Sequence, residues 1–487
     1  MKKGILLTTS LIFLSFGFLF LLISTRVLLV CLAVGGIASA YFIVSMFLAR
    51  RPKGSATPSS FPAPLLVLML AFPLILAAIL IYWGMFSIIT IVLLTGLTLV
   101  FFYNFLTLPL ALLHKHAEGK QAEATAPYPS VSILVPAYNE EGYVGRCIES
   151  LLEAEYPEDR KEIIVVDDGS TDGTYREAKA YEDEGVKVVH KENGGKYSAL
   201  NYGLIFASGE IIVTVDADSL IGRRSLKLMV GRFQEDPKIG AIAGNVKVVN
   251  RDSLLTKCQA LEYIASINIV RRAFDLFGAV TVVPGVLGAF RRKVLEGGGF
   301  YDSDTLTEDF DTTLKVLKTE SVVQACSGGK AFTEAPGTWM DLYRQRLRWY
   351  RGNFMTILKH GNVFGNPRFG FLYELAFPYL LLSMIFIPIA GVVVIISVIL
   401  GLVAGLAAQI LGLFAFFLLL QALLSALAVQ IDDEDVKLVA YSPLLVVGYK
   451  HFCDFVTMKS MMDVLLGREM GWTRAKRSLS PTSPSEG

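Results

Sequence analysis

The sequence predicts an α/β domain inserted between two blocks of membrane-spanning helices. Hydrophobic residues make up 53% of the 487 residues and charged residues only 18%, a balance too apolar for an ordinary soluble multidomain protein. The apolar residues gather in residues 1–115 and 371–466, in runs of about the 20 residues that a spanning helix requires. Between these blocks, residues 129–335 alternate short β-branched runs with helical stretches, as β–α–β units do.

The first block is expected to contain about four crossings. Its apolar runs are Ile5–Thr25, Val27–Ala49, Ala63–Trp83 and Met85–Leu106. A cleavable signal peptide is the alternative for the first run, although that run is long and no small-residue cleavage site follows it cleanly. The positive-inside rule places the basic residues around Lys2, Arg50 and Lys115 on the cytoplasmic side. We therefore expect a multi-pass protein of the cell membrane whose central domain is cytosolic.

The second block is less regular. Residues 371–430 are largely apolar and long enough for two or three spans. An acidic turn follows, and then a stretch, Leu438–Leu466, that contains ionisable residues, which near a membrane usually face protein or water. We expect two or more spans within 371–466 and a cytosolic tail, 467–487, whose Ser- and Pro-rich end is disordered.

The central domain is expected to contain a roughly parallel, doubly wound sheet. Five β-branched runs, each ending where turn or acidic residues begin, are the candidate strands: Val131–Val135, Ile163–Val166, Val186–His190, Ile211–Val215 and Ile239–Ala243. Ligands bind at the carboxyl ends of the strands in such sheets, so the residues that follow these runs are candidates for chemistry.

Two acidic motifs lie at such strand ends. Asp167 and Asp168 can accept hydrogen bonds from the ring NH and hydroxyl groups of a nucleoside; a turn with a helix N-cap is the alternative. Asp216 and Asp218, spaced i and i+2, can face one pocket and hold Mg²⁺ or Mn²⁺, which suits a nucleotide diphosphate leaving group. A solvated strand-to-helix turn is the alternative interpretation of the second motif.

A third acidic motif, residues 307–309, precedes a helix-like stretch. An N-terminal cap with acidic residues in the first turn is sufficient to explain Thr307 and Glu308. Asp309 is a candidate general base, because a lone carboxylate can take the proton of an attacking hydroxyl group.

Residues 336–362 are predicted to form an amphipathic helix at the membrane surface. At about 100° per residue, one apolar stripe contains Trp339, Tyr343, Leu347, Tyr350 and Phe354, and a neighbouring face contains Arg344, Arg348 and Arg351. The arginine face is expected to be free for phosphate, and Trp349 to stack on a sugar. An interfacial anchor without chemistry is the alternative.

Taken together and in this order, the motifs resemble the processive family-2 glycosyltransferases, which include cellulose, chitin, hyaluronan and poly-N-acetylglucosamine synthases. The resemblance covers about residues 100 to 475. It rests on the opening Pro136-Ala137-Tyr138-Asn139-Glu140, the D-D-G, D-x-D and T-E-D elements, and a Q-x-x-R-W element formed by Gln345, Arg348 and Trp349. The stretches 244–247, 285–291 and 345–349 are most similar to poly-N-acetylglucosamine and hyaluronan synthases.

The resemblance implies a GT-A fold and a role for each matched residue. Asp309 is implied to be the catalytic base, and Asp218, together with Asp216, to hold Mg²⁺ or Mn²⁺. The implied contacts to the nucleotide, the donor sugar or the chain end are Tyr138, Glu140, Asp167, Asp168, Lys196, Asp216, Gln345, Arg348 and Trp349. Trp472 and Arg474 resemble a gating element. A cytosolic gate requires a broken or interfacial segment at Leu438–Leu466, or one more crossing upstream.

The expected function is therefore inverting, processive transfer of a sugar, N-acetylglucosamine by resemblance, from a UDP-sugar to a polysaccharide that leaves through the protein's own membrane helices. A non-processive transferase to a lipid phosphate and a transporter with a nucleotide-binding domain are the alternatives. The net charge of +1 gives no global attraction for nucleic acid. Five scattered cysteines suggest neither a zinc site nor a disulfide framework. An accessory subunit stays open.

Overall fold

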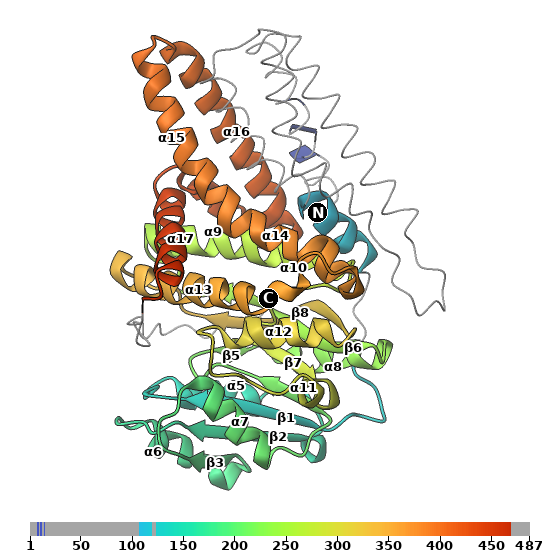
Figure 1. Cartoon of the computed structure of the whole chain (residues 1–487). Coiled ribbons are helices and arrows are strands. Elements are labelled where there is room, and N and C mark those ends of the chain that lie inside the picture. Colours follow the sequence, from blue (N-terminus) through green and yellow to red (C-terminus); the bar gives the residue numbers. More distant parts are fainter. Residues whose placement is uncertain (1–6, 9, 12–13, 15–106, 119–122, 469–487) are drawn as a thin grey trace. The chain divides into compact units, whose positions relative to one another are not determined.

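The computed structural model describes residues 7–8, 10–11, 14, 107–118 and 123–468 (Figure 1). The chain divides into two compact units, one made of residues 1–110 with 361–465 and the other of residues 111–360 with 466–487. The four predicted N-terminal crossings lie almost entirely outside the described residues. The same holds for Trp472 and Arg474.

The second unit is built on an eight-stranded sheet with the order β3-β2-β1-β4-β7-β6-β8-β5. Its strands are β1 Val131–Ala137, β2 Lys161–Asp167, β3 Lys187–His190, β4 Ile211–Thr214, β5 Leu220–Ile221, β6 Ile239–Val248, β7 Gly288–Arg291 and β8 Val322–Thr333. The five predicted strands are confirmed with shifted ends. In Figure 1, β3, β2 and β1 lie at the bottom of the view.

The sheet is mixed, which corrects the expectation of a roughly parallel sheet. Strands β3, β2, β1 and β4 are parallel, whereas β7 runs antiparallel to both β4 and β6. Strand β5 is antiparallel to β8, and β6 and β8 are parallel. Three strands were not predicted: β5 and β7 have only two and four residues, and Gly328 and Gly329 interrupt the β-branched pattern of β8.

Nine α-helices of this unit surround the sheet. They are α5 Val144–Leu152, α6 Thr174–Lys179, α7 Lys196–Phe206, α8 Ser225–Glu235, α9 Leu254–Glu262, α10 Ile269–Asp275, α11 Arg292–Gly297, α12 Glu308–Lys318 and α13 Trp339–Lys359, in the described part of the chain. A π-helical turn, η3 Tyr263–Asn268, joins α9 to α10. Helix α13 begins at a Thr338 cap, whose side chain accepts a hydrogen bond from the Asp341 N–H.

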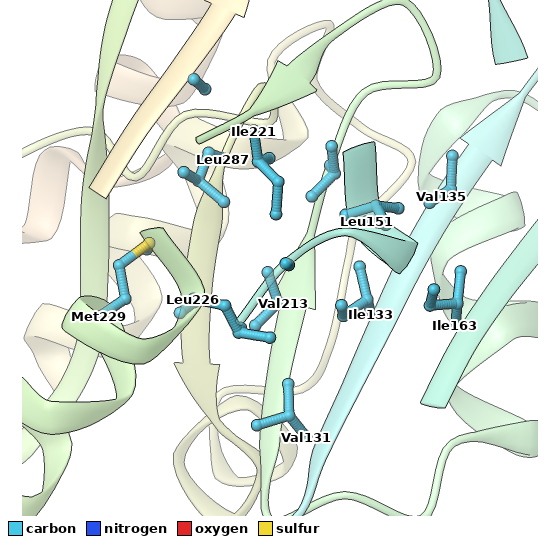
Figure 2. Close-up of a cluster of buried hydrophobic side chains, with 14 of the residues drawn as sticks. Val131, Ile133, Val135, Leu151, Ile163, Val213, Ile221, Leu226, Met229 and Leu287 are labelled. Atoms are coloured by element: carbon cyan, nitrogen blue, oxygen red, sulfur yellow. The ribbon is translucent and has the colours of Figure 1, made fainter. Parts of the chain in front are cut away.

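The core fills one face of the sheet and is shown in Figure 2. Because successive strand residues point to opposite faces, Ile133 and Val135 of β1 pack toward α5 and α8, where Leu151 and Met229 are also buried. Leu134 points to the other face, where Gly203 lets α7 lie directly on it. Both faces are covered, so ligands can enter only at the edge formed by strand ends and loops.

The first unit contains a series of apolar helices. They are η6 Leu372–Ala376, α14 Phe377–Leu381, η7 Leu382–Phe386, α15 Ile387–Val403, α16 Ala407–Ile431, η8 Val436–Leu445 and α17 Tyr449–Leu465. Two continuous segments of the described chain, Leu372–Val403 and Ile410–Ile431, have the length and composition of membrane spans. The stretch that follows is broken into η8 and α17 at Gly448, which has a φ of 80°.

Candidate active site

The carboxyl ends of β1, β2 and β4 bring the opening motif and two acidic motifs to one edge of the sheet. The parallel register places Ala137 beside Asp167 and Leu134 beside Thr214. Tyr138 therefore leaves β1 where Asp167 ends β2, as the sequence predicts for residues at strand ends. Tyr138 is partly exposed at this edge.

The D-D-G turn holds the neighbouring loop in place. The Asp168 carboxylate, with only 2% of the residue exposed, accepts hydrogen bonds from the Gly195 N–H at 2.8 Å, the Gly194 N–H at 3.1 Å and the Lys191 ammonium at 2.7 Å. Gly169 has a φ of 75°, and a Cβ there would lie 2.7 Å from a backbone nitrogen, so this position requires glycine. Asp168 thus organises the loop that leads into α7.

Asp167 and Glu140 are placed differently from each other. Asp167 is fully buried, and its carboxylate lies 2.6 Å from Nδ1 of His190. Glu140 is partly exposed, and its N–H donates to the Thr174 hydroxyl at 2.6 Å. The N-cap alternative is not confirmed, because the N-cap residue of α6 is Gly173; Asp172, one residue earlier, accepts a hydrogen bond from the Thr174 N–H at 3.0 Å. The opening motif and the D-D-G turn therefore form one hydrogen-bonded unit.

Lys196, the first residue of α7, connects two of the acidic motifs. Its ammonium lies 2.6 Å from the Asp216 carboxylate and 3.0 Å from the Glu308 carboxylate. Burial lowers the pKa of Lys196, but the surrounding carboxylates raise it by more, so the pKa lies above its usual value. Asp216 of the D-x-D motif and Glu308 of the T-E-D motif, which are 92 positions apart in the sequence, thus meet at one cation.

Asp309 lies next to this cluster. The Gly285 N–H points to its Oδ2 at 3.3 Å, and the Phe310 N–H donates to its Oδ1 at 2.8 Å. Burial and the neighbouring Glu308 carboxylate raise the pKa of Asp309 to about 6, although Lys196 acts in the opposite direction. Asp309 is therefore a carboxylate at neutral pH with a basicity suited to taking a proton.

The residues Asp216 and Asp218 fit a divalent cation. They are partly exposed on one turn, and the Ser219 hydroxyl donates to Asp218 at 3.0 Å. Burial, and after it the carboxylates of Asp218 and Asp216, raise the pKa of the Cys147 thiol. Two carboxylate oxygens with room for solvent and phosphate ligands are the donor set that Mg²⁺ and Mn²⁺ accept.

Helix α13 only partly follows the predicted division into faces. Leu347 and Phe354 are buried as expected, but Trp339 is 49% exposed. The expectation that the arginine face is free for phosphate is wrong for Arg351, which is 6% exposed and donates to the Arg468 carbonyl. It is wrong because α13 packs against protein along more of its circumference than a surface helix does.

Within the Q-x-x-R-W element, the three expected residues are partly buried. The side-chain oxygen of Gln345 is enclosed and has no hydrogen-bond partner among the described residues. The Trp349 ring packs on Tyr263, with ring centroids 6.3 Å apart, and on the guanidinium of Arg346. One face of Trp349 is therefore occupied by protein.

The ammonium of a lysine lies among three aspartates in a separate acidic cluster. Asp302, Asp304 and Asp311 lie close enough together to hold a metal ion. The ammonium of Lys359 lies 2.6 Å, 2.7 Å and 3.0 Å from their carboxylates in that order, and Nε2 of His360 lies 2.8 Å from Asp311. This group is an ion-pair network that joins α12 to the end of α13.

Four residues near the expected site were not predicted from the sequence. Glu308 was explained as a helix cap but pairs with Lys196, and the loop residue Gly285 approaches both Lys196 and Asp309. The buried Arg346 and the partly buried Glu262 form an ion pair next to Trp349. The Pro-Gly pair at 284–285 signals a turn, but nothing in the sequence indicates which side chains that turn contacts.

Comparisons with known proteins agree with this geometry. Residues 132–299 match Glycosyl transferase family 2. The chain is 35% identical over 233 residues to a poly-β-1,6-N-acetyl-D-glucosamine synthase of Staphylococcus epidermidis, covering 47% of this chain and 56% of that protein. It is 30% identical over 231 residues to the synthase of the same name from Staphylococcus aureus strain MW2, with the same coverage. The chain thus spans about half the length of the curated relatives it matches.

Among solved structures, a mannosyltransferase from Pyrobaculum calidifontis in complex with GDP-Man and Mn²⁺ has a similar fold. The TM-score is 0.55 at 22% identity, and the match covers 78% of this chain and 100% of the mannosyltransferase. The likeness supports a GT-A-like fold with a mixed sheet for the second unit. Residues 132–299 therefore form a glycosyl transferase family 2 domain.

Proposed function

We propose that this protein is a glycosyltransferase, and specifically an inverting, processive polysaccharide synthase that transfers N-acetylglucosamine from UDP-N-acetylglucosamine to a growing chain. The observation that carries the proposal is the position of Asp309 beside the Lys196, Asp216 and Glu308 cluster. The choice of donor is supported by the names of the curated relatives, which are poly-β-1,6-N-acetyl-D-glucosamine synthases.

In the proposed reaction, an acceptor hydroxyl gives its proton to the Asp309 carboxylate, and its oxygen forms a bond to C1 of the donor sugar. The bond from C1 to the diphosphate oxygen breaks, and UDP leaves with the electron pair. Attack from the side opposite the leaving group inverts the configuration at C1, and no covalent enzyme intermediate forms. The raised pKa of Asp309 supports its role, since a base of pKa about 6 is ionised at pH 7.

The negative charge of the leaving group is proposed to be stabilised by basic side chains of the protein and by a metal ion. Lys196 and Arg348 are proposed to stabilise the diphosphate as charge develops on it. Asp218 and Asp216 would hold Mg²⁺ or Mn²⁺, which when bound offsets the charge of departing UDP. The nucleoside is assigned to the partly exposed Tyr138 and Glu140 and to the D-D-G turn, in which the fully buried Asp167 acts through its contact with His190, and the diphosphate or chain end to Gln345, Arg348 and Trp349. Asp168 contributes by holding loop 191–195.

The membrane arrangement is part of the same proposal. Residues 1–115 and 371–466 are proposed to form the membrane region, with residues 129–335 and the helix within 336–362 on the cytosolic side. The break at Gly448 supports an even number of crossings before the tail, because α17 is not among the candidate spans. The tail, 467–487, then carries Trp472 and Arg474 on the side of the catalytic domain, where a gate over the nucleotide is needed.

Extrusion through the chain's own helices has a specific support within the first unit. Helix α17 carries two lysine–aspartate pairs, Lys450 with Asp454 and Lys459 with Asp463. A Cβ at Gly391 of α15 would lie 2.7 Å from the Asp454 carboxylate, so α15 packs directly against this pair. Partly buried ionisable groups among apolar helices favour a polar path, which a chain of hydroxyl groups requires to cross hydrocarbon.

Donor-dependent UDP release tests the proposal. The full-length protein in detergent is given UDP-N-acetylglucosamine alone, UDP-glucose alone, or UDP-N-acetylglucosamine with UDP-glucuronate, each with Mg²⁺ or Mn²⁺ and with EDTA. Release with UDP-N-acetylglucosamine alone, together with a high-mass product and loss of activity in EDTA, is expected. Dependence on two donors would overturn the single-sugar product. Release without a high-mass product would favour a lipid-phosphate acceptor, and silence with every donor would mean that another subunit is required.

A further inference from the structure

Arg346, which lies inside the Q-x-x-R-W element but is not one of its three matched residues, is the largest fully buried side chain in the described part of the chain. Only 1% of it is exposed. An arginine is rarely buried to this degree unless its charge is paired. This costly buried charge lies on α13, three positions before Trp349.

The contacts of Arg346 connect a carboxylate to an aromatic ring. Its Nη2 lies 2.6 Å from Oε2 of Glu262, the last residue of α9. The guanidinium carbon lies 4.4 Å from the centroid of the Trp349 ring and 5.9 Å from that of Tyr263. A planar guanidinium can stack on an aromatic ring while it donates at its edge to a carboxylate, which the compact ammonium of lysine cannot do.

Packing alone does not account for this arrangement. A buried ion pair is often no more stabilising than apolar residues of the same volume, so a methionine or leucine would fill the space between α9 and α13. The ion pair orients these side chains: the hydrogen bond to Glu262 fixes the plane of the Arg346 guanidinium. The indole of Trp349 stacks on that plane, so one of its faces is fixed as well. The Tyr263 ring, tilted by 50° to Trp349, limits the indole from a second side.

The orientation of Trp349 matters because α13 lies against the T-E-D element. A Cβ at Gly352, one turn after Trp349, would lie 2.7 Å from the Thr307 side chain and 2.9 Å from its backbone nitrogen. Helix α13 therefore contacts the chain two residues before Asp309. We propose that Arg346, held by Glu262, is a positioning residue that fixes the indole of Trp349 for contact with the acceptor sugar. The proposal rests on the proposed function for the identity of that sugar.

A spectroscopic readout separates positioning from stability. The chain contains four tryptophans, so full-length protein labelled with 5-fluorotryptophan is expected to give four ¹⁹F resonances, and Trp349→Phe identifies one of them. Arg346→Lys retains the charge for Glu262 but loses the planar stack. In this variant the Trp349 resonance is expected to shift or broaden while the other three stay in place. Glu262→Gln, at a side chain that is 17% exposed, is expected to change the same resonance and serves if Arg346→Lys folds poorly.

Kinetics then test the effect on the acceptor. With a β-1,6-linked N-acetylglucosamine oligosaccharide as acceptor, Arg346→Lys is expected to raise the acceptor KM about tenfold, the equivalent of about 1.4 kcal/mol, and to leave the KM for UDP-N-acetylglucosamine within about twofold. Combining it with Trp349→Phe should add nothing to the Trp349→Phe defect. An unchanged Trp349 resonance, or defects that multiply, would overturn the proposal. If the wild type failed to use this donor, the proposed function would fail while the ¹⁹F result still decided the role of Arg346.

Discussion

Replacing Gly285 by alanine tests whether Lys196 is positioned by the loop that covers it. An added Cβ would lie 2.3 Å from the Lys196 ammonium and 3.2 Å from the Asp216 carboxylate. The nearest atom is the end of a flexible side chain, so we expect the ammonium to move away while the backbone stays in place. The substitution then removes the cation from the carboxylates of Asp216, Glu308 and Asp309 without changing any charged residue.

The expected magnitude follows from the contacts that are lost. Charge-assisted hydrogen bonds contribute about 1.5–3 kcal/mol each, and Lys196 is only 28% exposed. If about 2 kcal/mol of this acts on the developing charge of the leaving group, kcat falls about thirtyfold. Because Lys196 lowers the pKa of Asp309, its displacement raises that pKa further above about 6. The acid limb of kcat/KM should therefore move to higher pH.

The direction of the pH effect separates chemistry from unfolding. A carboxyl whose pKa is raised by folding binds a proton more tightly in the folded state, so protonation between its usual value of 3.8 and about 6 stabilises the fold. Activity that is lost as the pH falls from about 7 to about 5 is then lost from a protein that is no less stable. In the wild type the acid limb is expected near pH 6.

UDP release across pH 5–9 by the full-length protein, alongside its thermal midpoint, is the assay. Gly297→Ala is the matched control, because nothing lies within 4 Å of a Cβ added there. Alanine has a higher helix propensity than glycine, so this variant should be more stable by about 1 kcal/mol. Lys196→Met should reproduce the Gly285→Ala defect, and the double variant should be no worse. A Gly285→Ala enzyme with wild-type kcat and an unmoved acid limb would refute the role assigned to Lys196.

Three further predictions concern the same unit. Asp309→Asn should lower sugar transfer by about 10³-fold or more and leave UDP affinity, measured by calorimetry, within about twofold; normal activity would contradict the assignment of the base. Gly352→Ala should destabilise the fold by about 1–3 kcal/mol in thermal unfolding, because its Cβ meets Thr307; a stabilised variant would show that α13 can move away. Lys359→Met leaves the fully buried Asp311 with less positive charge and should cost about 3 kcal/mol of unfolding free energy, which an unchanged melting temperature would exclude.

The elements that carry strong local patterns were predictable. β1, β2, β4 and β6 are largely buried β-branched runs, β3 is a shorter and more exposed one, and α13, Trp339–Lys359, lies within the predicted 336–362. The acidic motifs could be placed at one edge of the sheet because they directly follow strands, and parallel strands end at a common edge. Strand β5 has only two residues, β7 contains no β-branched residue, and β8 is interrupted by two glycines, so none of the three shows a strand pattern.

The sequence by itself determined which residues could do chemistry, because the carboxylates that follow strands and the Q-x-x-R-W element can be recognised from the order of the residues alone. It did not determine their partners. That Lys196 joins Asp216 to Glu308, that Gly285 approaches Asp309, and that Arg346 of α13 pairs with Glu262 of α9 were decided only by the tertiary structure. The physical reason is that each of these contacts joins residues on separate elements, whose distance depends on how α7, α12 and α13 pack and not on any local pattern.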